Sequence, residues 1–434
     1  MKIKNITIKN FRNFNDYTLE LGGQTTILIG KNGMGKTNLL SALVKSLSFV
    51  FSKPKGTKQY DFIASSDQSV NGFTSTDAHY GEKEDGTYDY HYPVRLALEG
   101  SLDDAKIGWH FEQETASSRL KESQYRDAYN AFWECYNQKD EKPVFAYFSD
   151  SFPHKDSNIS QKMSDRLKSG NPLPQNSGYY KWDDEQSCVE IWVKYFTMQW
   201  MNNRLTPDAE KQVYVDAIMT TMKEFSMPVS AYNRNEDLKV ADMKVEVRED
   251  KQVLIVIFEN GKQIPYSNLP QGYRRMFSIL FDIANRSYLL NKHCNPEGVV
   301  FIDEIELHLH PSIAKEILPR LLRAFPRLQF IVSTHSPLVI TNFKQDDDNK
   351  LFKLYYDEED GVYSNERIPD IFGLDYNSGL TDVMNTEHTD ENLSKLKKAY
   401  EYWKERDENK ANQIADMLRE HCKEDSLFLR SLNL

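Results

Sequence analysis

The sequence contains few cysteines and no long apolar run. Its four cysteines, Cys135, Cys188, Cys294 and Cys422, lie far apart and include no C-x-x-C pair, so neither a zinc ribbon nor a disulfide framework is indicated. No run of about 18 uncharged apolar residues occurs, which argues against a membrane-spanning helix. The first residues alternate between apolar and polar side chains and lack the apolar block of a secretory signal. We therefore expect a soluble, cytoplasmic protein that makes no membrane contact.

An excess of basic residues is also lacking. The 54 Lys and Arg residues are outnumbered by 65 Asp and Glu, which gives a net charge of −11. This balance argues against a protein that coats DNA over its whole surface, so any contact with nucleic acid has to be local. The 39% of hydrophobic residues suffices for a substantial core. We expect two or three domains, or one elaborated α/β domain.

The most informative segment is Gly30–Thr37, which satisfies the pattern G-x-x-x-x-G-K-T. Such a loop offers converging backbone N–H groups, a lysine for the β- and γ-phosphates and a hydroxyl for Mg²⁺. Residues 25–29 read as a strand, and residues 38–44 as a helix whose N-terminus faces the phosphates. A glycine-rich turn without a ligand is the alternative. We predict a nucleotide site made by Asn32, Gly33, Gly35, Lys36, Thr37 and Asn38, with Thr37 as a metal ligand.

Two later strands are predicted to bring chemistry to the same site. Residues 299–302 form an apolar run that ends in Asp303 and Glu304, which suit a magnesium shell and the polarisation of an attacking water. Two acids can also end a strand in solvent, but here they follow a phosphate loop. A further run, 329–333, leads to His335 at the sheet edge where ligands bind in open α/β folds. We predict that His335 contacts the γ-phosphate.

Three segments together resemble the ABC-type ATPase heads of the SMC/RecF class. Residues 10–14 resemble its N-F-R-x-F segment, residues 303–311 its D-E-P-E-x-H-L-H-P segment, and residues 333–337 its S-T-H-S-P switch. The resemblance implies an α/β ABC-type ATPase head with a mostly parallel sheet flanked by helices. The residue patterns themselves predict a β-rich N-terminal lobe, a helical insertion and an amphipathic C-terminal helical hairpin. The resemblance also implies ATP and Mg²⁺ as cofactors, Arg12 as a nucleotide-binding residue, and a homodimer or higher oligomer formed through the heads.

The signature segment departs from this class. Residues 269–275 occupy the place of the signature L-S-x-G, and Gly272 is retained as a residue expected to meet the nucleotide of another subunit. Pro270 stands where a serine hydroxyl would contact that γ-phosphate. A lost hydrogen bond to a charged group costs about 1.5–3 kcal/mol, or roughly tenfold to a hundredfold in rate. We therefore predict slow hydrolysis, with ATP acting chiefly as a clamp between subunits.

The segments after the switch histidine resemble Septu-type anti-phage ATPases, including those paired with retrons. The similarity lies in residues 352–355 and 373–384 and in the helical hairpin that follows. It implies a sensor and scaffold subunit that controls a partner nuclease of the HNH class and contacts nucleic acid through the complex. About 75 residues after residue 360 are too few for a Toprim fold, and no H-N-H cluster is evident, so the chain itself is not expected to cut.

The predicted organisation has four parts. They are an N-terminal lobe with the phosphate loop (1–118), a mainly helical insertion (119–235), a C-terminal lobe with signature, Walker B strand and switch histidine (236–360), and a helical partner-docking region (361–434). Two other functions stay open, namely a RecF/SMC-like ATP-dependent DNA-binding repair factor and a defence ATPase partnered with a Toprim nuclease. A transporter ATPase subunit fits poorly, because the signature is altered and the insertions are large. The neighbouring reading frame would distinguish them.

Overall fold

The structure is a computed structural model that divides into two compact units, Met1–Gly373 and Leu374–Leu434. It describes residues 1–52, 70, 72–82, 86–102, 105–138, 141–151, 160–184, 189–229, 239–249, 251–384, 391–404, 406–422, 429 and 432. The predicted division at residues 118, 235 and 360 stays a prediction.

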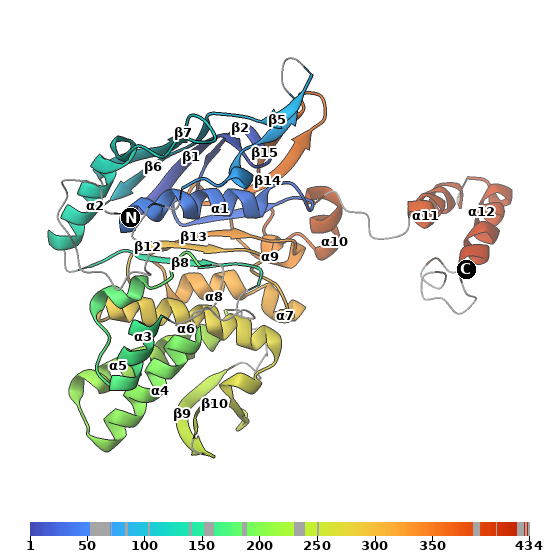
Figure 1. Cartoon of the computed structure of the whole chain (residues 1–434). Coiled ribbons are helices and arrows are strands. Elements are labelled where there is room, and N and C mark those ends of the chain that lie inside the picture. Colours follow the sequence, from blue (N-terminus) through green and yellow to red (C-terminus); the bar gives the residue numbers. More distant parts are fainter. Residues whose placement is uncertain are drawn as a thin grey trace. The chain divides into compact units, whose positions relative to one another are not determined.

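A six-stranded sheet forms the centre of the first unit (Figure 1). Its order is β15 (Val362–Ile368), β14 (Asn349–Asp357), β3 (Thr25–Ile29), β13 (Leu328–Ser333), β12 (Gly298–Ile302) and β8 (Val144–Phe148). The five strands from β14 to β8 are parallel, and only the edge strand β15 is antiparallel. Every residue of β3, β8, β12 and β13 is buried, as expected of parallel strands covered on both faces. Their carboxyl ends therefore meet at one edge.

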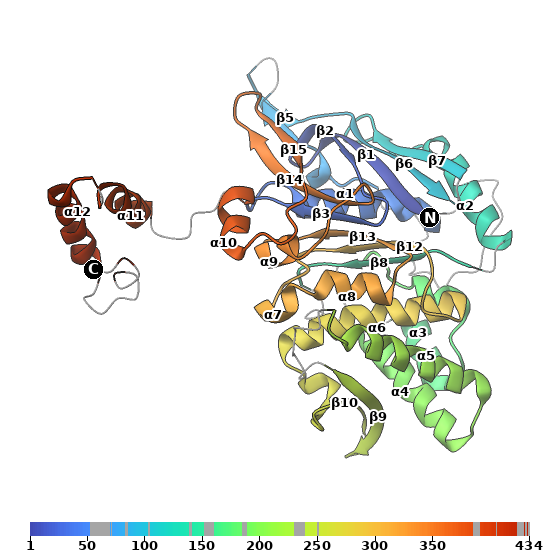
Figure 2. The ribbon, with the colours of Figure 1, turned by 180° about the vertical axis from the view of Figure 1, so that it is seen from behind.

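A second, antiparallel sheet makes the N-terminal part β-rich. Its order is β2 (Phe14–Glu20), β1 (Lys2–Phe11), β6 (Val94–Leu102) and β7 (Ala105–Gln113). Apolar residues alternate with polar ones along β1 and β6, so one face is buried. That face covers helix α1 (Lys36–Leu47), which lies between the two sheets (Figure 1). At the far end β15 lies beside β2 (Figure 2), where the Asn365 amide donates to the Thr18 carbonyl at 2.9 Å.

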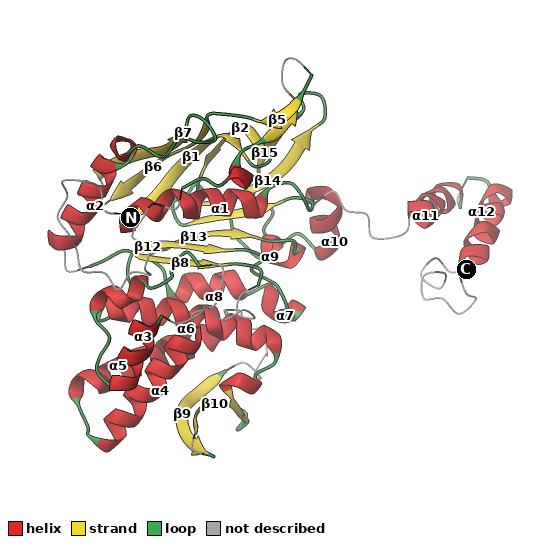
Figure 3. Cartoon of the chain, viewed as in Figure 1, coloured by secondary structure: helices red, strands yellow, loops and turns green. Residues whose placement is uncertain are grey.

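Helices cover the opposite face of the central sheet (Figure 3). The longest is α6 (Gln271–Asn291), which is buried along most of its length and packs against α4 (Val189–Leu205) and α5 (Ala209–Ser226). Two buried charges of α6 are paired, since Arg286 bonds Asp282, whose second oxygen accepts a hydrogen bond from the Trp192 indole at 2.7 Å. Burial of such groups is tolerable because each has a partner.

Further helices, strands and turns complete the first unit. The helices are α2 (Arg126–Gln138), α3 (Gln161–Ser169), α7 (Pro311–Ala314), α8 (Ile317–Ala324) and α9 (Pro337–Thr341), and the strands are β4 (Tyr80–Glu82), β5 (Tyr88–Tyr90), β9 (Val240–Arg248), β10 (Lys251–Phe258) and β11 (Gln263–Pro265). Single 3₁₀ turns are η1 (Ser48–Phe51), η2 (Ser75–Asp77), η3 (Glu122–Gln124), η4 (Gln175–Tyr179) and η6 (Tyr266–Asn268). The predicted α/β fold, with a β-rich N-terminal lobe and a mostly parallel sheet flanked by helices, is confirmed. The segment predicted as a mainly helical insertion also supplies β8.

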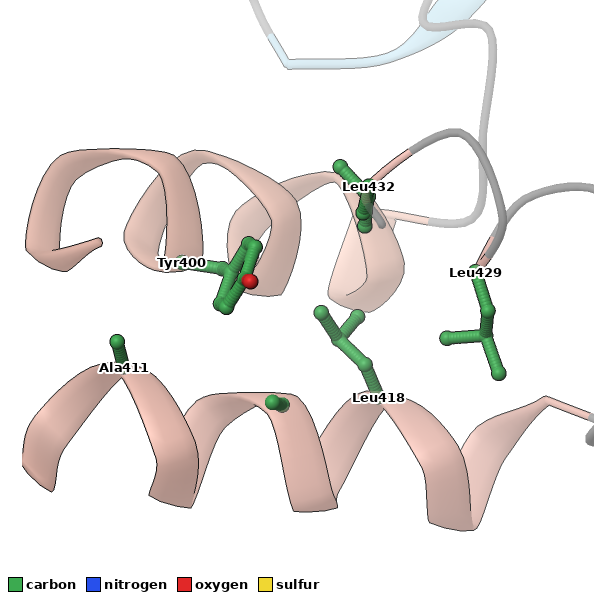
Figure 4. Packing of buried hydrophobic residues seen from close by; sticks show 6 residues of the cluster. Tyr400, Ala411, Leu418, Leu429 and Leu432 are labelled. Atoms are coloured by element: carbon green, nitrogen blue, oxygen red, sulfur yellow. The ribbon is translucent and has the colours of Figure 1, made fainter. Parts of the chain in front are cut away.

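The second unit has a core of its own. It contains α10 (Tyr376–Ser378), the π-helical turn η7 (Gly379–Val383), α11 (Glu391–Trp403) and α12 (Glu408–His421). Asp407 caps α12 by accepting the Lys410 backbone N–H at 3.2 Å. The buried residues of α11, α12 and the segment beyond them pack together (Figure 4): Tyr400, Ala411, Ala415, Leu418, Leu429 and Leu432. The predicted amphipathic hairpin is thus present.

Among the described residues, no helix combines the length and apolar character that a bilayer crossing requires.

Candidate nucleotide site

The phosphate loop joins β3 to α1 at the carboxyl edge of the central sheet. Gly35, the residue before α1, has a φ of 91°, and a Cβ there would lie 2.4 Å from the Asn13 amide nitrogen. Both observations require glycine. No described side chain caps α1, so the N–H groups of its first turn can bind a ligand of negative charge. Asn32 and Gly33 lie exposed in the same loop.

Lys36 closes over this loop. Its ammonium donates to the carbonyl oxygens of Gly30 at 2.8 Å and Lys31 at 3.2 Å. Burial lowers the pKa of Lys36, while the nearby carboxylates of Asp303 and Glu304 oppose that shift. The lysine is therefore a desolvated cation beside the loop, as a phosphate ligand requires.

Thr37 and Asp303, far apart in the sequence, meet at the same place. The Thr37 hydroxyl donates to Asp303 Oδ2 at 2.7 Å, and the Ser333 hydroxyl donates to the other oxygen, Oδ1. Hydroxyl and carboxylate oxygens are the hard donors that Mg²⁺ prefers, so this pair fits a magnesium ion bound together with nucleotide phosphates. Within the described ranges no group of three or more His, Cys, Asp or Glu could hold a metal alone. Phosphate oxygens would have to complete the shell.

Glu304 follows directly in a conformation unusual for its residue type. Its φ is 48°, and its backbone N–H donates to the Ser333 hydroxyl at 2.8 Å. Such a left-handed conformation costs on the order of 1 kcal/mol and persists where the surroundings impose it. Burial raises the pKa of Glu304, and the charges of Asp303 and Asp150 raise it further. A carboxylate with a raised pKa is a better proton acceptor near neutral pH.

His335 stands opposite Glu304, with 4.0 Å between Nε2 and Oε1. Glu306 holds this switch in place, because its carboxylate accepts the His335 backbone N–H and the Thr334 hydroxyl, each at 2.6 Å. Burial lowers the pKa of His335, as does the charge of Lys36. The imidazole is therefore neutral at pH 7 and can donate one hydrogen bond.

Arg12 is tied to the start of α1. Its guanidinium donates to Asn38 at 3.0 Å and to Asp77 at 3.1 Å, and the Asn38 amide donates to Asn13 at 2.7 Å. Asp77 also pairs with Lys45 at 3.2 Å. The structure thus brings Arg12 and Asn38 together beside the phosphate loop, and Asp77 is the buried anchor of Arg12. Nucleotide binding by Arg12 and Asn38 stays a prediction.

Gly272 lies in the first turn of α6. A Cβ there would come within 2.4 Å of the His308 carbonyl oxygen. Glycine is therefore required by packing within the chain, in addition to any contact with a second subunit. The predicted contact with another subunit's phosphate stays a prediction.

Arg275 was not predicted. It is 1% exposed, and its guanidinium donates to the carbonyl oxygens of Asp303 at 2.8 Å and Ser149 at 3.2 Å, with further bonds to Glu304 and Asp150. It joins α6 to the ends of β12 and β8, and burial lowers its pKa to about 10. The same reasoning missed Ser333 and Glu306, although both lie in the segments that carried the resemblance.

Comparison with known proteins agrees with this geometry. Residues 1–340 match the family model described as AAA ATPase domain. The Retron Vc95 probable ATPase of Vibrio cholerae serotype O1 biovar El Tor is 25% identical over 386 residues, which cover 79% of this chain and 71% of that protein. The Septu protein PtuA of Bacillus mycoides (strain KBAB4) is 34% identical over 114 residues, 26% of this chain and 16% of PtuA. The resemblance to Septu and retron ATPases is confirmed.

Among solved structures, the SMC head domain from Thermotoga maritima aligns with 85% of this chain and 100% of its own length, at 11% identity and a TM-score of 0.46.

Proposed function

We propose that this chain, which belongs to the AAA ATPase domain family, is an ATP-binding, slowly hydrolysing sensor and scaffold subunit of an anti-phage defence complex. The observation that carries the ATPase part is the meeting of Thr37 with Asp303 at 2.7 Å, beside the phosphate loop. It joins a phosphate-binding loop to an acidic strand end at the carboxyl edge of a parallel sheet, where ligands of open α/β folds bind.

In this proposal the residues divide the work. Lys36 and the first N–H groups of α1 bind the β- and γ-phosphates, and Thr37 and Asp303 would hold Mg²⁺. The ion would neutralise charge on the phosphate oxygens. Glu304 accepts the proton of the attacking water, which its raised pKa favours. Neutral His335 donates a hydrogen bond to the γ-phosphate, and Arg275 is a positioning residue that fixes the Asp303 and Glu304 backbone.

Slow hydrolysis and dimerisation rest on the start of α6. Pro270 precedes the helix and offers no side-chain hydrogen bond. A second head that approached this helix with its nucleotide would meet the α6 N-terminus and Gly272 but no serine hydroxyl. Hydrolysis would then be slower than in a head that has the signature serine. ATP would therefore hold the two heads together for longer.

The partner is proposed to be an HNH-class nuclease, because the chain is similar to a Septu protein and to a retron ATPase. Nucleic acid would be reached through that complex. The test is to co-purify the chain with the product of the adjacent reading frame and to assay cleavage. An adjacent Toprim frame, or ATP-dependent DNA binding by this chain alone, would favour the alternative functions.

The nucleotide site has its own test. We expect Lys36→Ala to abolish ATP binding, because it removes the desolvated cation beside the loop. Equilibrium binding of ATP with Mg²⁺ measures the effect. Lys106→Ala, which changes an exposed lysine of β7, is the matched control and should bind like the parent chain. ATP binding retained by Lys36→Ala would refute the proposed placement of the phosphates.

A further inference from the structure

A cavity lies in the helical part of the first unit, away from the nucleotide site. It has a volume of about 380 Å³ and is lined by α4, the start of α5 and the end of α6. Tyr288 of the lining is 16 residues after Gly272 on the same helix, or roughly 24 Å along its axis at about 1.5 Å per residue. Cavities of several hundred cubic ångströms hold small molecules. The cavity therefore has the size of a ligand site and a location of its own.

Three tyrosines form its aromatic wall. Tyr195, Tyr214 and Tyr288 are 5%, 3% and 6% exposed, and each lines the cavity. The Tyr214 ring centroid lies 5.3 Å from that of Tyr195 and 5.1 Å from that of Tyr288. One pair of rings is tilted and the other meets edge to face. An aromatic wall of this kind suits a flat aromatic ligand, which can pack against a ring face or a ring edge.

Gln199 supplies an unsatisfied polar group in the same lining. It is 2% exposed, and its Nε2 has no hydrogen-bond partner among the described residues. A buried amide without a partner is costly, so a ligand that accepts its hydrogen bond is favoured. A glutamine amide carries a donor and an acceptor side by side, and this pair matches the adjacent N6 donor and N7 acceptor of adenine.

The charges around the cavity cancel. Lys211 and Lys292 are balanced by Asp208 and Glu210. Asp208 accepts the backbone N–H groups of Glu210 at 2.9 Å and Lys211 at 3.2 Å, so it already occupies the N-terminus of α5 that a phosphate would use. A free phosphate group and the backbone of a nucleic acid are both disfavoured here.

We propose that this cavity binds a free nucleoside, with its base among the three tyrosines and hydrogen-bonded to Gln199. The site is separate from the ATP site and does not depend on the proposed ATPase function. The helical region would then hold a second ligand site in addition to the ATP site.

The test is a calorimetric titration of the full chain with adenosine, with thymidine, AMP and a short single-stranded oligonucleotide as comparators. We expect one adenosine per chain. Gln199→Leu, which keeps the side-chain shape, should weaken adenosine binding about tenfold or more. Ala209→Trp, which places a large ring at the exposed cavity lining, should abolish it. Gln263→Leu on the exposed part of β11 is the matched control and should change nothing.

Lys36→Ala separates this site from the other. Adenosine binding should survive that change, and ATP binding should survive Gln199→Leu and Ala209→Trp. The proposal is wrong if adenosine does not bind at millimolar concentration, or if neither cavity variant weakens it. AMP or the oligonucleotide binding tenfold tighter than adenosine would also overturn it, because the ligand would then be an anion or a nucleic acid.

Discussion

The carboxyl edge of the central sheet and the helical region around α6 bury charges in opposite ways. In the helical region Arg286 bonds Asp282, and Arg320 bonds Glu316 at 2.7 Å, so each buried cation faces a carboxylate. At the sheet edge Lys36 and Arg275 donate to backbone carbonyl oxygens instead. The carboxylates of Asp303 and Glu304 are therefore not paired with these cations, and they can bind an ion or a proton. The helical region uses charge to fix packing, and the edge keeps charge available for a ligand.

The largest expected effect tests the helical side of this comparison. Arg286→Met leaves Asp282 buried without its cation, which should lower the free energy of unfolding by about 3–5 kcal/mol. Denaturant unfolding measures it. Arg126→Met is the control, since its pair with Glu122 is partly exposed and should contribute less than about 1 kcal/mol. An equal loss of unfolding free energy in both variants would show that the buried pair does not fix the packing of the helical region.

At the sheet edge, Glu304→Gln should reduce ATP hydrolysis about 10²- to 10⁴-fold, because it removes the proton acceptor. ATP should stay bound. Burial raises the pKa of Glu304, so its ionised form is disfavoured in the fold and the variant should not lose stability at pH 7. Steady-state turnover and thermal unfolding are the measurements, with the exposed Glu359→Gln as control. A large loss of stability would mean that this carboxylate is structural.

Pro270→Ser asks whether the signature limits the rate. The serine restores one hydroxyl at the start of α6, which should raise turnover by roughly tenfold to a hundredfold if a second head docks there. It also adds an N-cap worth about 1 kcal/mol. Turnover measured across protein concentrations separates the two effects. A more stable protein with unchanged turnover would contradict the dimer model.

The smallest effect concerns pH. The pKa of His335 is lowered in the fold, so between that value and about 6.5 the unfolded chain binds more protons than the folded one. Stability should therefore rise with pH across this window and fall on acidification below about pH 6.5. The side chain is 35% exposed, so solvent screening limits the effect on stability. Thermal unfolding at pH 7.5 and 5.5, compared with His335→Gln, measures it; an equal pH response in both proteins would exclude His335 as the cause.

Much of this architecture could be predicted from local sequence. Strands such as β3 and β12 are apolar runs because both their faces are buried. The residue pattern predicts a helix over about 272–290, and α6 is observed over Gln271–Asn291. The pattern also predicts one helix near 312–325, which is instead divided into α7 and α8. The division falls at Lys315 and Glu316, where the Glu316 backbone N–H donates to the Ile313 carbonyl at 2.9 Å, a bond of the 3₁₀ type.

What local sequence could not predict depends on contacts between distant segments. The sequence around Arg275 does not indicate that its partners are the carbonyls of Asp303 and Ser149. Asp77 lies in a polar stretch that predicts a loop, yet it is 1% exposed and anchors Arg12. The phosphate loop and the acids carried motifs, whereas Arg275 and Asp77, which fix the segments around them, lie outside any motif.

The close approach of Gly272 to the His308 carbonyl limits the substitutions that either segment can accept during evolution. Because a Cβ at 272 would meet a carbonyl at 2.4 Å, no larger residue fits unless the loop after the acidic strand moves as well. A substitution of Gly272 would thus displace the loop that contains His308, although the sequence of that loop is unchanged. In descendants of this gene the two segments should change together or stay as they are.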